Sequence, residues 1–333
     1  MKKFICILFL LSVSIITAQN KVGTTAAEFL TIPVGSKAMG MGGAFTGLAD
    51  DITAAFYNPG SLSRIEGNQF ISNYSEWLVD SKYSWFGLGI KASDDDYITL
   101  SVTSLDYGDE EVTTISEPEG TGQMWNASDI AIALSYSRNL TDRFSIGGSV
   151  KYIQQKIWNE SASSFAIDLG LLYKTQVDGL NIGMSITNFG TQMKLDGKDL
   201  LTAVDVDQSY NYNNSTITSG LSTDEWELPL VFTVGSSWRF NLWDEFAFTT
   251  AVDAVIPSNA NTHINLGSEL QWNNIFFARI GKSSLFKENA QEGLTFGAGI
   301  KYELSGIKVA VEYAYLDFGM WSNLNRYSIT IGF

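Results

Sequence analysis

The chain of 333 residues is 45% hydrophobic but only 17% charged, and its mean hydropathy is close to zero. A soluble domain carries about 25% charged residues, whereas a helical membrane protein has apolar runs of about 20 residues. Beyond the N-terminus, every apolar run in this sequence is interrupted by polar residues within a few positions. These values exclude a polytopic helical membrane protein and disfavour an ordinary soluble enzyme. The net charge of −15 argues against nucleic acid as a partner, because phosphate backbones require a basic surface.

Residues 1–18 have the pattern of a secretory signal peptide. Two lysines follow Met1, an apolar stretch covers residues 4–16, and the small residue Ala18 stands before a glutamine. We therefore predict export with cleavage after Ala18; a transmembrane anchor is the alternative, which the short apolar stretch disfavours. Cleavage also removes Cys6, the only cysteine, so the mature chain is predicted to have neither a disulfide nor a thiolate metal site.

Residues 19–67 are rich in glycine and alanine and form a distinct N-terminal segment. Small residues allow one backbone to approach another closely, so we predict that this segment is a hatch, or plug, inside a lumen. The paired acids are predicted to cap a short helix over residues 52–57, and the proline that follows is predicted to fix a turn. A glycine-rich phosphate loop is the alternative, but a dinucleotide site needs a βαβ unit, so no cofactor is predicted. The residues of this hatch motif are Gly40, Gly42, Gly43, Asp50, Asp51, Asn58 and Pro59.

Residues 68–333 alternate between apolar side chains and polar or small ones. In residues 294–304, for example, the apolar side chains fall on even positions, and Thr, Gly, Lys and Glu fall on odd ones. A soluble β-sandwich and an outer-membrane barrel both produce this pattern. Many segments run for 10 to 13 residues, which is longer than sandwich strands of about 5–6 and suits membrane strands of about 9–11. Aromatic residues also recur near the segment ends, as in interfacial girdles.

Fourteen such segments can be counted, an even number as bacterial barrels require. The connections after even-numbered segments are short, whereas those after odd-numbered segments tend to be long, at about 107–127, 191–227 and 284–291. This asymmetry is typical of periplasmic turns and external loops. We therefore predict an all-β fold, a 14-stranded antiparallel transmembrane barrel over residues 68–333. The predicted strands cover residues 68–79, 82–93, 96–106, 128–139, 142–157, 162–175, 179–190, 228–240, 244–256, 262–273, 275–283, 292–304, 306–318 and 323–333.

Two stretches of the sequence resemble a known family. They are GSKAMGMGGAFTGLADDITAAFYNPGSL at residues 35–62 and AYLDFGMWSNLNRYSITIGF at residues 314–333. With the export signal and the fourteen strands, they resemble the PorV/PorQ family of outer-membrane barrels of the Bacteroidetes and relatives, which is related to the FadL transporters. The resemblance covers essentially the whole mature chain and implies a 14-stranded barrel with an N-terminal hatch in a Gram-negative outer membrane. The last strand, which ends at Phe333, resembles the signal that the barrel assembly machinery binds.

The resemblance leaves two functions open. PorV members act in type IX secretion, so it implies secreted cargo C-terminal signal domains and other secretion-system proteins as partners, besides membrane lipid. We hypothesise that residues 191–227 help to form the external binding surface. FadL relatives move hydrophobic compounds, so an uptake channel is the alternative. A general porin is disfavoured by the predicted plug, and no enzymatic activity is expected. The candidate partner-contact residues are Trp125, Tyr210, Tyr212 and Trp226.

Candidate chemical sites in the sequence are few. His263 is the only histidine, and the nearby Ser268 has the opposite strand parity, so the two side chains are predicted to face opposite sides of a strand. The acids at 94–96 suit calcium, but a solvated turn is the simpler interpretation. No catalytic, cofactor or metal residue is predicted. Charged residues on the predicted inward face are expected to pair with one another and with the hatch, because isolated charges in a lumen are costly. These residues are Lys151, Asp168, Arg239, Asp253, Glu269, Lys301, Lys308 and Glu312.

Overall fold

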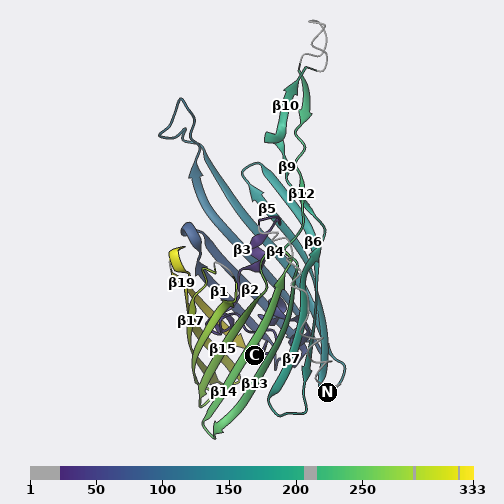
Figure 1. The fold of residues 1–333 in the computed structure, drawn as a ribbon, viewed down its shortest axis with the longest axis vertical. Coiled ribbons are helices and arrows are strands. Elements are labelled where there is room, and N and C mark those ends of the chain that lie inside the picture. The colour runs from purple at the N-terminus through teal and green to yellow at the C-terminus, as the bar shows by residue number, and fades with distance from the viewer. Residues whose placement is uncertain (1–22, 206–215, 288–289, 322) are drawn as a thin grey trace, which may run out of the picture.

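A computed structural model describes residues 23–205, 216–287, 290–321 and 323–333 of the chain. Within these ranges, fourteen antiparallel strands form one barrel wall, which closes where β6 returns to β5 (Figure 1). Among the described residues, no helix is long and apolar enough to cross a membrane. The wall strands are β1 (Gln69–Glu76), β2 (Lys82–Lys91), β3 (Asp96–Glu111), β4 (Met124–Asn139), β5 (Phe144–Ile157), β6 (Glu160–Lys174), β7 (Leu180–Gly190), β13 (Val231–Trp243), β14 (Phe246–Pro257), β15 (His263–Trp272), β16 (Phe276–Leu285), β17 (Leu294–Leu304), β18 (Ile307–Asp317) and β19 (Asn323–Gly332).

The observed wall confirms the predicted all-β class, strand number and antiparallel order. Each predicted strand corresponds to one observed strand, with ends that differ by a few residues. The main difference lies in β3 and β4, which continue to Glu111 and from Met124 as a long hairpin, so the predicted loop 107–127 begins and ends in strand and only residues 112–123 lie outside it. Ladder hydrogen bonds continue across this hairpin beyond a β-bulge, although residues 106–111 are exposed on both faces.

The two faces of the wall differ in polarity, as the alternation predicts. In β17, Phe296, Ile300 and Tyr302 point outward and are exposed. Across the wall, residues of the opposite parity are mostly small or polar, and many of them are buried against the N-terminal segment. An apolar surface of this extent is unfavourable in water, so the outer face requires a lipid environment.

Aromatic side chains gather at one end of the outer wall. From Trp243 through Phe246 and Trp272 to Phe276, successive ring centroids are 5.9, 6.3 and 5.5 Å apart. This row lies at the end where neighbouring strands are joined by short turns, such as residues 273–275 and 305–306. Aromatic girdles occur at both interfaces of outer-membrane barrels, whereas short turns mark the periplasmic side. We therefore name this the periplasmic end, and the opposite end, with the long hairpins, the external end.

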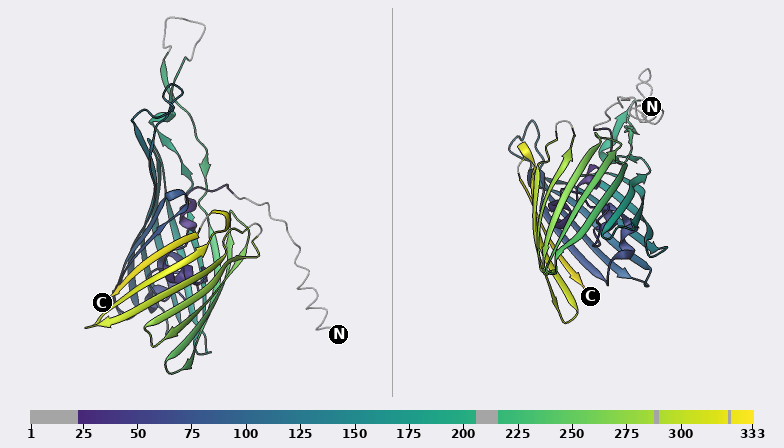
Figure 2. Two further views of the ribbon diagram at one scale, coloured as in Figure 1. Left: turned by 90° about the vertical axis from the view of Figure 1, so that its left-hand side faces the viewer. Right: turned by 60° about the horizontal axis from the view of Figure 1, so that its bottom comes forward.

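The predicted loop 191–227 contains short elements that extend outward from the external end (Figures 1 and 2). A two-stranded hairpin within it has all of its described strand residues exposed. Tyr210 and Tyr212 lie outside the described residues. The elements of this loop are β8 (Met193–Lys194), β9 (Asp196–Gly197), η4 (Lys198–Leu200), β10 (Leu201–Val204), β11 (Ile217–Gly220) and β12 (Glu225–Trp226).

The N-terminal segment runs down the inside of the barrel from the external end to the periplasmic end (Figure 2). The backbone amide of Ala26 donates to Glu227 O at 2.9 Å, near the external rim. Arg64 donates to the carbonyl oxygens of Thr141 and Asp142 in a periplasmic turn, at 2.8 Å each. Its short helical elements are η1 (Glu28–Thr31), α2 (Ser36–Gly40), α3 (Ala54–Tyr57) and η2 (Pro59–Arg64).

Two local predictions for this segment need correction. The helix expected over residues 52–57 begins only at Ala54, and Asp51 accepts the Thr53 amide at 2.8 Å in the turn before it. Asp50 caps no helix, because its carboxylate binds Lys37. Pro59 begins the 3-10 helix η2 instead of a turn, since a proline suits a first helical position where no amide donor is needed.

Candidate functional site: the closed lumen

The glycines of the N-terminal segment lie directly against the backbone of the wall. Gly42 has φ +66°, and a Cβ placed on it would lie 2.6 Å from Leu266 O and from Lys282 N. Gly47 is as tightly placed, since its Cβ would lie 2.8 Å from the Ser236 Cα. Any larger side chain would push the segment away from the wall, so the small residues noted in the sequence are required by this close approach.

Buried polar groups fix the segment at defined points of the wall. The carboxylate of Asp253, on the inner face of β14, accepts the amides of Phe45 and Thr46 at 2.9 and 2.8 Å. Asn58, from the predicted motif, donates its side-chain amide to Thr46 O and to Leu171 O at 2.9 Å each. Buried polar groups are costly unless they are hydrogen-bonded, and these contacts therefore specify one position for the segment.

The external half of the lumen is filled with apolar side chains. Phe29, Leu30 and Ile32 of the segment are buried in one cluster with residues from the inner faces of β3 and β5, including Leu105 and Ile153. Side chains from the external loop, such as Met193 and Leu228, and the partly buried Trp77 cover the same cluster. The lumen is therefore closed at this end by hydrophobic packing.

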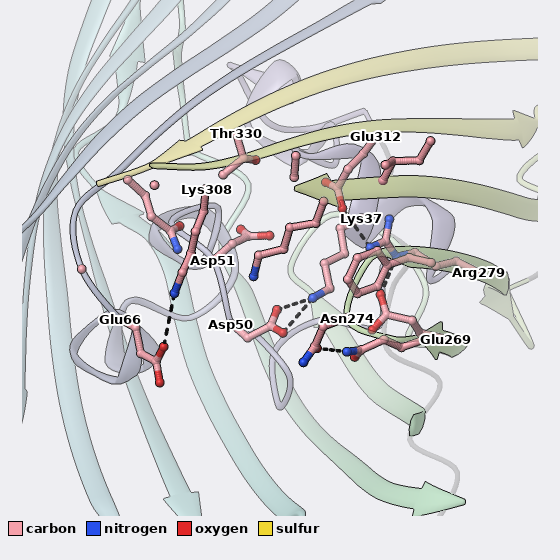
Figure 3. Close-up of a pocket in the computed structure, with 18 of the residues that line it drawn as sticks. Lys37, Asp50, Asp51, Glu66, Glu269, Asn274, Arg279, Lys308, Glu312 and Thr330 are labelled. Atoms are coloured by element: carbon pink, nitrogen blue, oxygen red, sulfur yellow. Dashed lines mark hydrogen bonds and ion pairs between the residues drawn. The ribbon is translucent and has the colours of Figure 1, made fainter. Parts of the chain in front are cut away.

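The periplasmic half of the lumen holds a charged cavity of about 250 Å³ (Figure 3). At its centre, Arg279 of β16 lies between two carboxylates, with Nε 2.6 Å from Glu269 and Nη2 2.8 Å from Glu312. Nearby, Lys37 of α2 binds the carboxylate of Asp50 at 2.7 Å. The remaining charged residues that line the cavity are Asp51, Glu66, Arg239, Lys301 and Lys308.

The charges of the segment influence one another strongly. Although burial disfavours its charged form, the carboxylates of Asp50 and Glu269 raise the pKa of Lys37 above its ordinary value. Burial alone would raise the pKa of Asp50, but Lys37 outweighs that effect and lowers it. Burial and, after it, the negative charge of Asp50 raise the pKa of Asp51 to about 6. Asp51 therefore changes its charge near neutral pH, while its neighbours stay ionised.

The inward charges predicted from strand parity are paired as expected in several places. Lys151 lies 2.8 Å from Asp168, Arg239 donates to Gln271 at 2.8 Å, and Asp253 binds the segment as described above. Lys301 and Lys308 line the charged cavity. His263 contacts the carbonyl oxygen of Asn261 at 3.1 Å, a local backbone contact. Among the described residues, no group of three or more His, Cys, Asp or Glu is arranged to hold a metal ion.

The other predicted residues lie at the rims of the barrel. Trp125 is in β4 and Trp226 in β12, where its side chain is exposed and its backbone pairs with Met193. Phe333 follows β19 at the periplasmic end, and its backbone exchanges hydrogen bonds with Asn68 at 2.9 Å.

Two buried arginines were missed by the sequence analysis. Arg279 and Arg326 both point inward from strands that are otherwise apolar outside. Arg326 is fully buried, lies 5.1 Å from the ring of Tyr83 and donates to Pro33 O of the segment. Their strand parity was the available signal, because each alternates with lipid-facing residues such as Ile280 and Tyr327.

Comparisons with known proteins identify the fold. No family model matches the sequence, and no curated protein matches it. Among solved structures, a FadL homologue of Pseudomonas aeruginosa matches with a TM-score of 0.55 and 13% identity, over 90% of this chain and 98% of that one. The toluene transporter TbuX of Ralstonia pickettii matches with 0.55 and 12%, over 90% and 97% of the two chains. The toluene transporter TodX of Pseudomonas putida matches with 0.54 and 13%, over 90% and 96%.

These identities are low, so the matches concern the fold. Two of these structures are toluene transporters and the third is a FadL homologue, which agrees with the prediction of no enzymatic activity. They do not distinguish the PorV/PorQ subgroup, which stays a prediction from sequence. The chain has the fold of the FadL-like, 14-stranded outer-membrane barrels.

Proposed function

We propose that the chain is an outer-membrane channel for hydrophobic compounds, with residues 19–67 as its hatch and residues 1–18 as a cleaved export signal. The observation that carries this proposal is the apolar cluster around Phe29 in the external half of the lumen. The wall side of that cluster is an apolar surface inside a barrel, which a hydrophobic solute can occupy when the hatch moves. The FadL-like fold supports the same function by analogy.

In this structure the hatch closes the lumen, so transport requires it to move. The contacts that hold it to the wall are local: glycine packing at Gly42 and Gly47, and hydrogen bonds to Asp253. The Lys37–Asp50 ion pair lies within the hatch, and the wall itself closes through ladder hydrogen bonds. A shift of the hatch therefore leaves the barrel intact.

Uptake by whole cells tests the proposal. A strain that lacks the gene should take up a hydrophobic probe, such as a radiolabelled alkylbenzene or long-chain fatty acid, more slowly than the complemented strain.

The variant Gly42→Val should release the hatch and raise ion conductance of the purified barrel in planar bilayers. Gly220→Val is the matched control, because a Cβ there meets only the Leu201 side chain at 4.0 Å. Unchanged uptake in the deletion strain would contradict the proposal.

A second function, binding of secreted cargo in type IX secretion, has support from the external hairpin β10–β11. Its apolar side chains Leu201, Val204 and Ile217 are exposed, and an isolated two-stranded hairpin is marginally stable in water. A partner that covers it would stabilise it. Deletion of residues 198–221 should abolish surface attachment of cargo if this function holds, while uptake of hydrophobic probes continues. Retained cargo attachment together with lost uptake would leave only the channel.

A further inference from the structure

The strands β3, β4, β5 and β6 are neighbours in the sheet (Figure 1). The outer face of these four strands has a groove. Gly148 of β5 is paired with Tyr136 on one side and with Leu169 on the other. The glycine therefore leaves a gap between two large side chains of the outer face. The result is a groove of about 330 Å³. Its apolar lining residues are Ile98, Leu134, Tyr136, Val150 and Ile167.

A charged pair borders the periplasmic end of this groove. Arg138 and Asp96 are opposite each other on β4 and β3, with Nε 3.7 Å from Oδ1. Arg138 is two residues beyond Tyr136 and points to the same face of the strand. The two residues are about 7 Å apart along the strand. Its side chain is 54% exposed, and that of Asp96 is 20% exposed. The hydroxyl of Tyr136 donates to Asp96 at 2.5 Å and so connects the groove to the pair.

The level of the pair along the wall matches the headgroup region of the inner leaflet. The next outward row toward the periplasm contains the aromatic pair Phe144 and Tyr173, at the position of an interfacial girdle. An arginine on the lipid face costs several kcal/mol at the midplane but about 0–1 kcal/mol near the interface. Arg138 therefore has its guanidinium where lipid phosphates lie, with an apolar groove directly above it.

We propose that this groove and the Arg138–Asp96 pair form a binding site for a zwitterionic aminophospholipid of the inner leaflet, such as phosphatidylethanolamine. One acyl chain lies in the groove over Gly148. The phosphate binds the Arg138 guanidinium, which presents two parallel donors to such groups, and the ammonium binds the carboxylate of Asp96. The turn before Asp96 adds Asp94 and Asp95, which favours a headgroup with a positive end over a purely anionic one. This site is independent of what passes through the lumen.

Native mass spectrometry of the full-length protein in detergent, with phosphatidylethanolamine or phosphatidylglycerol added, tests the site. Phosphatidylethanolamine should bind the wild type at least about fivefold more tightly than phosphatidylglycerol. Gly148→Leu should weaken both lipids about tenfold by filling the groove; its Cβ would lie 3.1 Å from Asp168 O, a tight contact that requires a small shift of the backbone. Ser163→Leu, which adds the same side chain to the outer face of β6 nearer the external end, is the control.

The charged pair has its own variants. Arg138→Gln should weaken both lipids, whereas Asp96→Asn should remove only the preference for phosphatidylethanolamine, because an amide still accepts from Tyr136. Arg143→Gln, in the adjacent turn, is the matched control for loss of one positive charge. Heat-modifiable migration on gels shows that each variant is folded. Equal binding of the two lipids by the wild type, or equal effects of Gly148→Leu and Ser163→Leu, would overturn the proposal.

Discussion

The two halves of the lumen are closed by different physical means. In the external half, Phe29 and its neighbours are buried against apolar residues of β3 and β5. In the periplasmic half, Arg279, Glu269 and Glu312 form a buried ionic cluster beside the charged cavity. Hydrophobic packing thus joins the hatch to the wall at one end, whereas at the other end ion pairs link charged side chains of the wall to one another and of the hatch to one another. Hydrophobic packing is insensitive to pH and little weakened by salt, whereas ion pairs respond to both, so the two halves can be released under different conditions.

The largest expected effect concerns the ionic cluster of the periplasmic half. Arg279→Met leaves Glu269 and Glu312 without their shared cation, and Glu269 is only 3% exposed. Removal of one partner from a buried pair costs about 3–5 kcal/mol, because an uncompensated charge stays buried. Denaturant unfolding of the barrel in lipid vesicles should show a loss of this size.

The matched control removes the stranded charges as well. The triple variant Arg279→Met, Glu269→Gln, Glu312→Gln should recover most of the lost free energy, since neutral groups of similar volume replace the ions. If the triple variant is as unstable as Arg279→Met alone, the cluster acts through packing. The contrast between the two halves of the lumen would then disappear.

In the external half, Phe29→Ala should loosen the hatch by about 3 kcal/mol, the usual cost of removing a buried phenyl group. That loss corresponds to roughly a hundredfold faster hydrogen exchange for amides of residues 26–34. The effect should be the same at pH 5 and pH 8, because no charge is involved. Val204→Ala, at an exposed site of β10, should leave the exchange unchanged, and a pH-dependent effect of Phe29→Ala would contradict the hydrophobic closure.

The wall was predictable from sequence because one rule applies along its whole length. Each strand faces lipid on one side, so alternation revealed all fourteen strands and their order along the chain. The ends of the extended hairpin β3–β4 were predicted less accurately, because residues beyond the membrane face water on both sides and do not alternate. For example, residues 106–111 of β3 are all exposed.

The interior was predictable only in part, because it depends on which strands meet across the hatch. Gly42 and Asn58 were identified from composition, yet their wall contacts at Leu266 and Leu171 lie far away in sequence. Strand parity places Arg279 on the inward face, but nothing in the sequence indicates that it meets Glu269 and Glu312. Strand parity predicts whether a side chain points inward or outward. Which residue it then contacts depends on the tertiary structure of the closed barrel.

A smaller, pH-dependent effect is expected at Asp51. Burial and the charge of Asp50 raise the pKa of Asp51 to about 6, so the folded protein favours its protonated form. Stability from this group is therefore complete below its ordinary pKa and is lost as the pH rises through 6. Above pH 7, Asp51→Asn should be more stable than the wild type by about 1–2 kcal/mol, and at pH 4 the two should be equal.

Unfolding midpoints measured between pH 4 and pH 8 check this prediction. Asn keeps an oxygen that accepts the Thr53 amide, so the turn before α3 is retained. An equal difference between the two proteins at every pH would show that the charge of Asp51 has no part in it. The periplasmic half would then resemble the external half in its response to pH.

The smallest effect is expected for the ion pair between Lys37 and Asp50. Because the Asp50 side chain is 41% exposed, Lys37→Met should cost only about 0.5–1 kcal/mol, and the difference from the wild type should shrink between 50 mM and 500 mM salt as screening increases. The same variant removes a cation that holds down the pKa of Asp51, so its pH transition should move upward. A small loss of stability that depends on salt, together with an upward shift of the Asp51 transition, would show that Lys37 acts through its charge. A packing defect at Lys37 would instead change stability equally at all salt concentrations and leave the Asp51 transition in place.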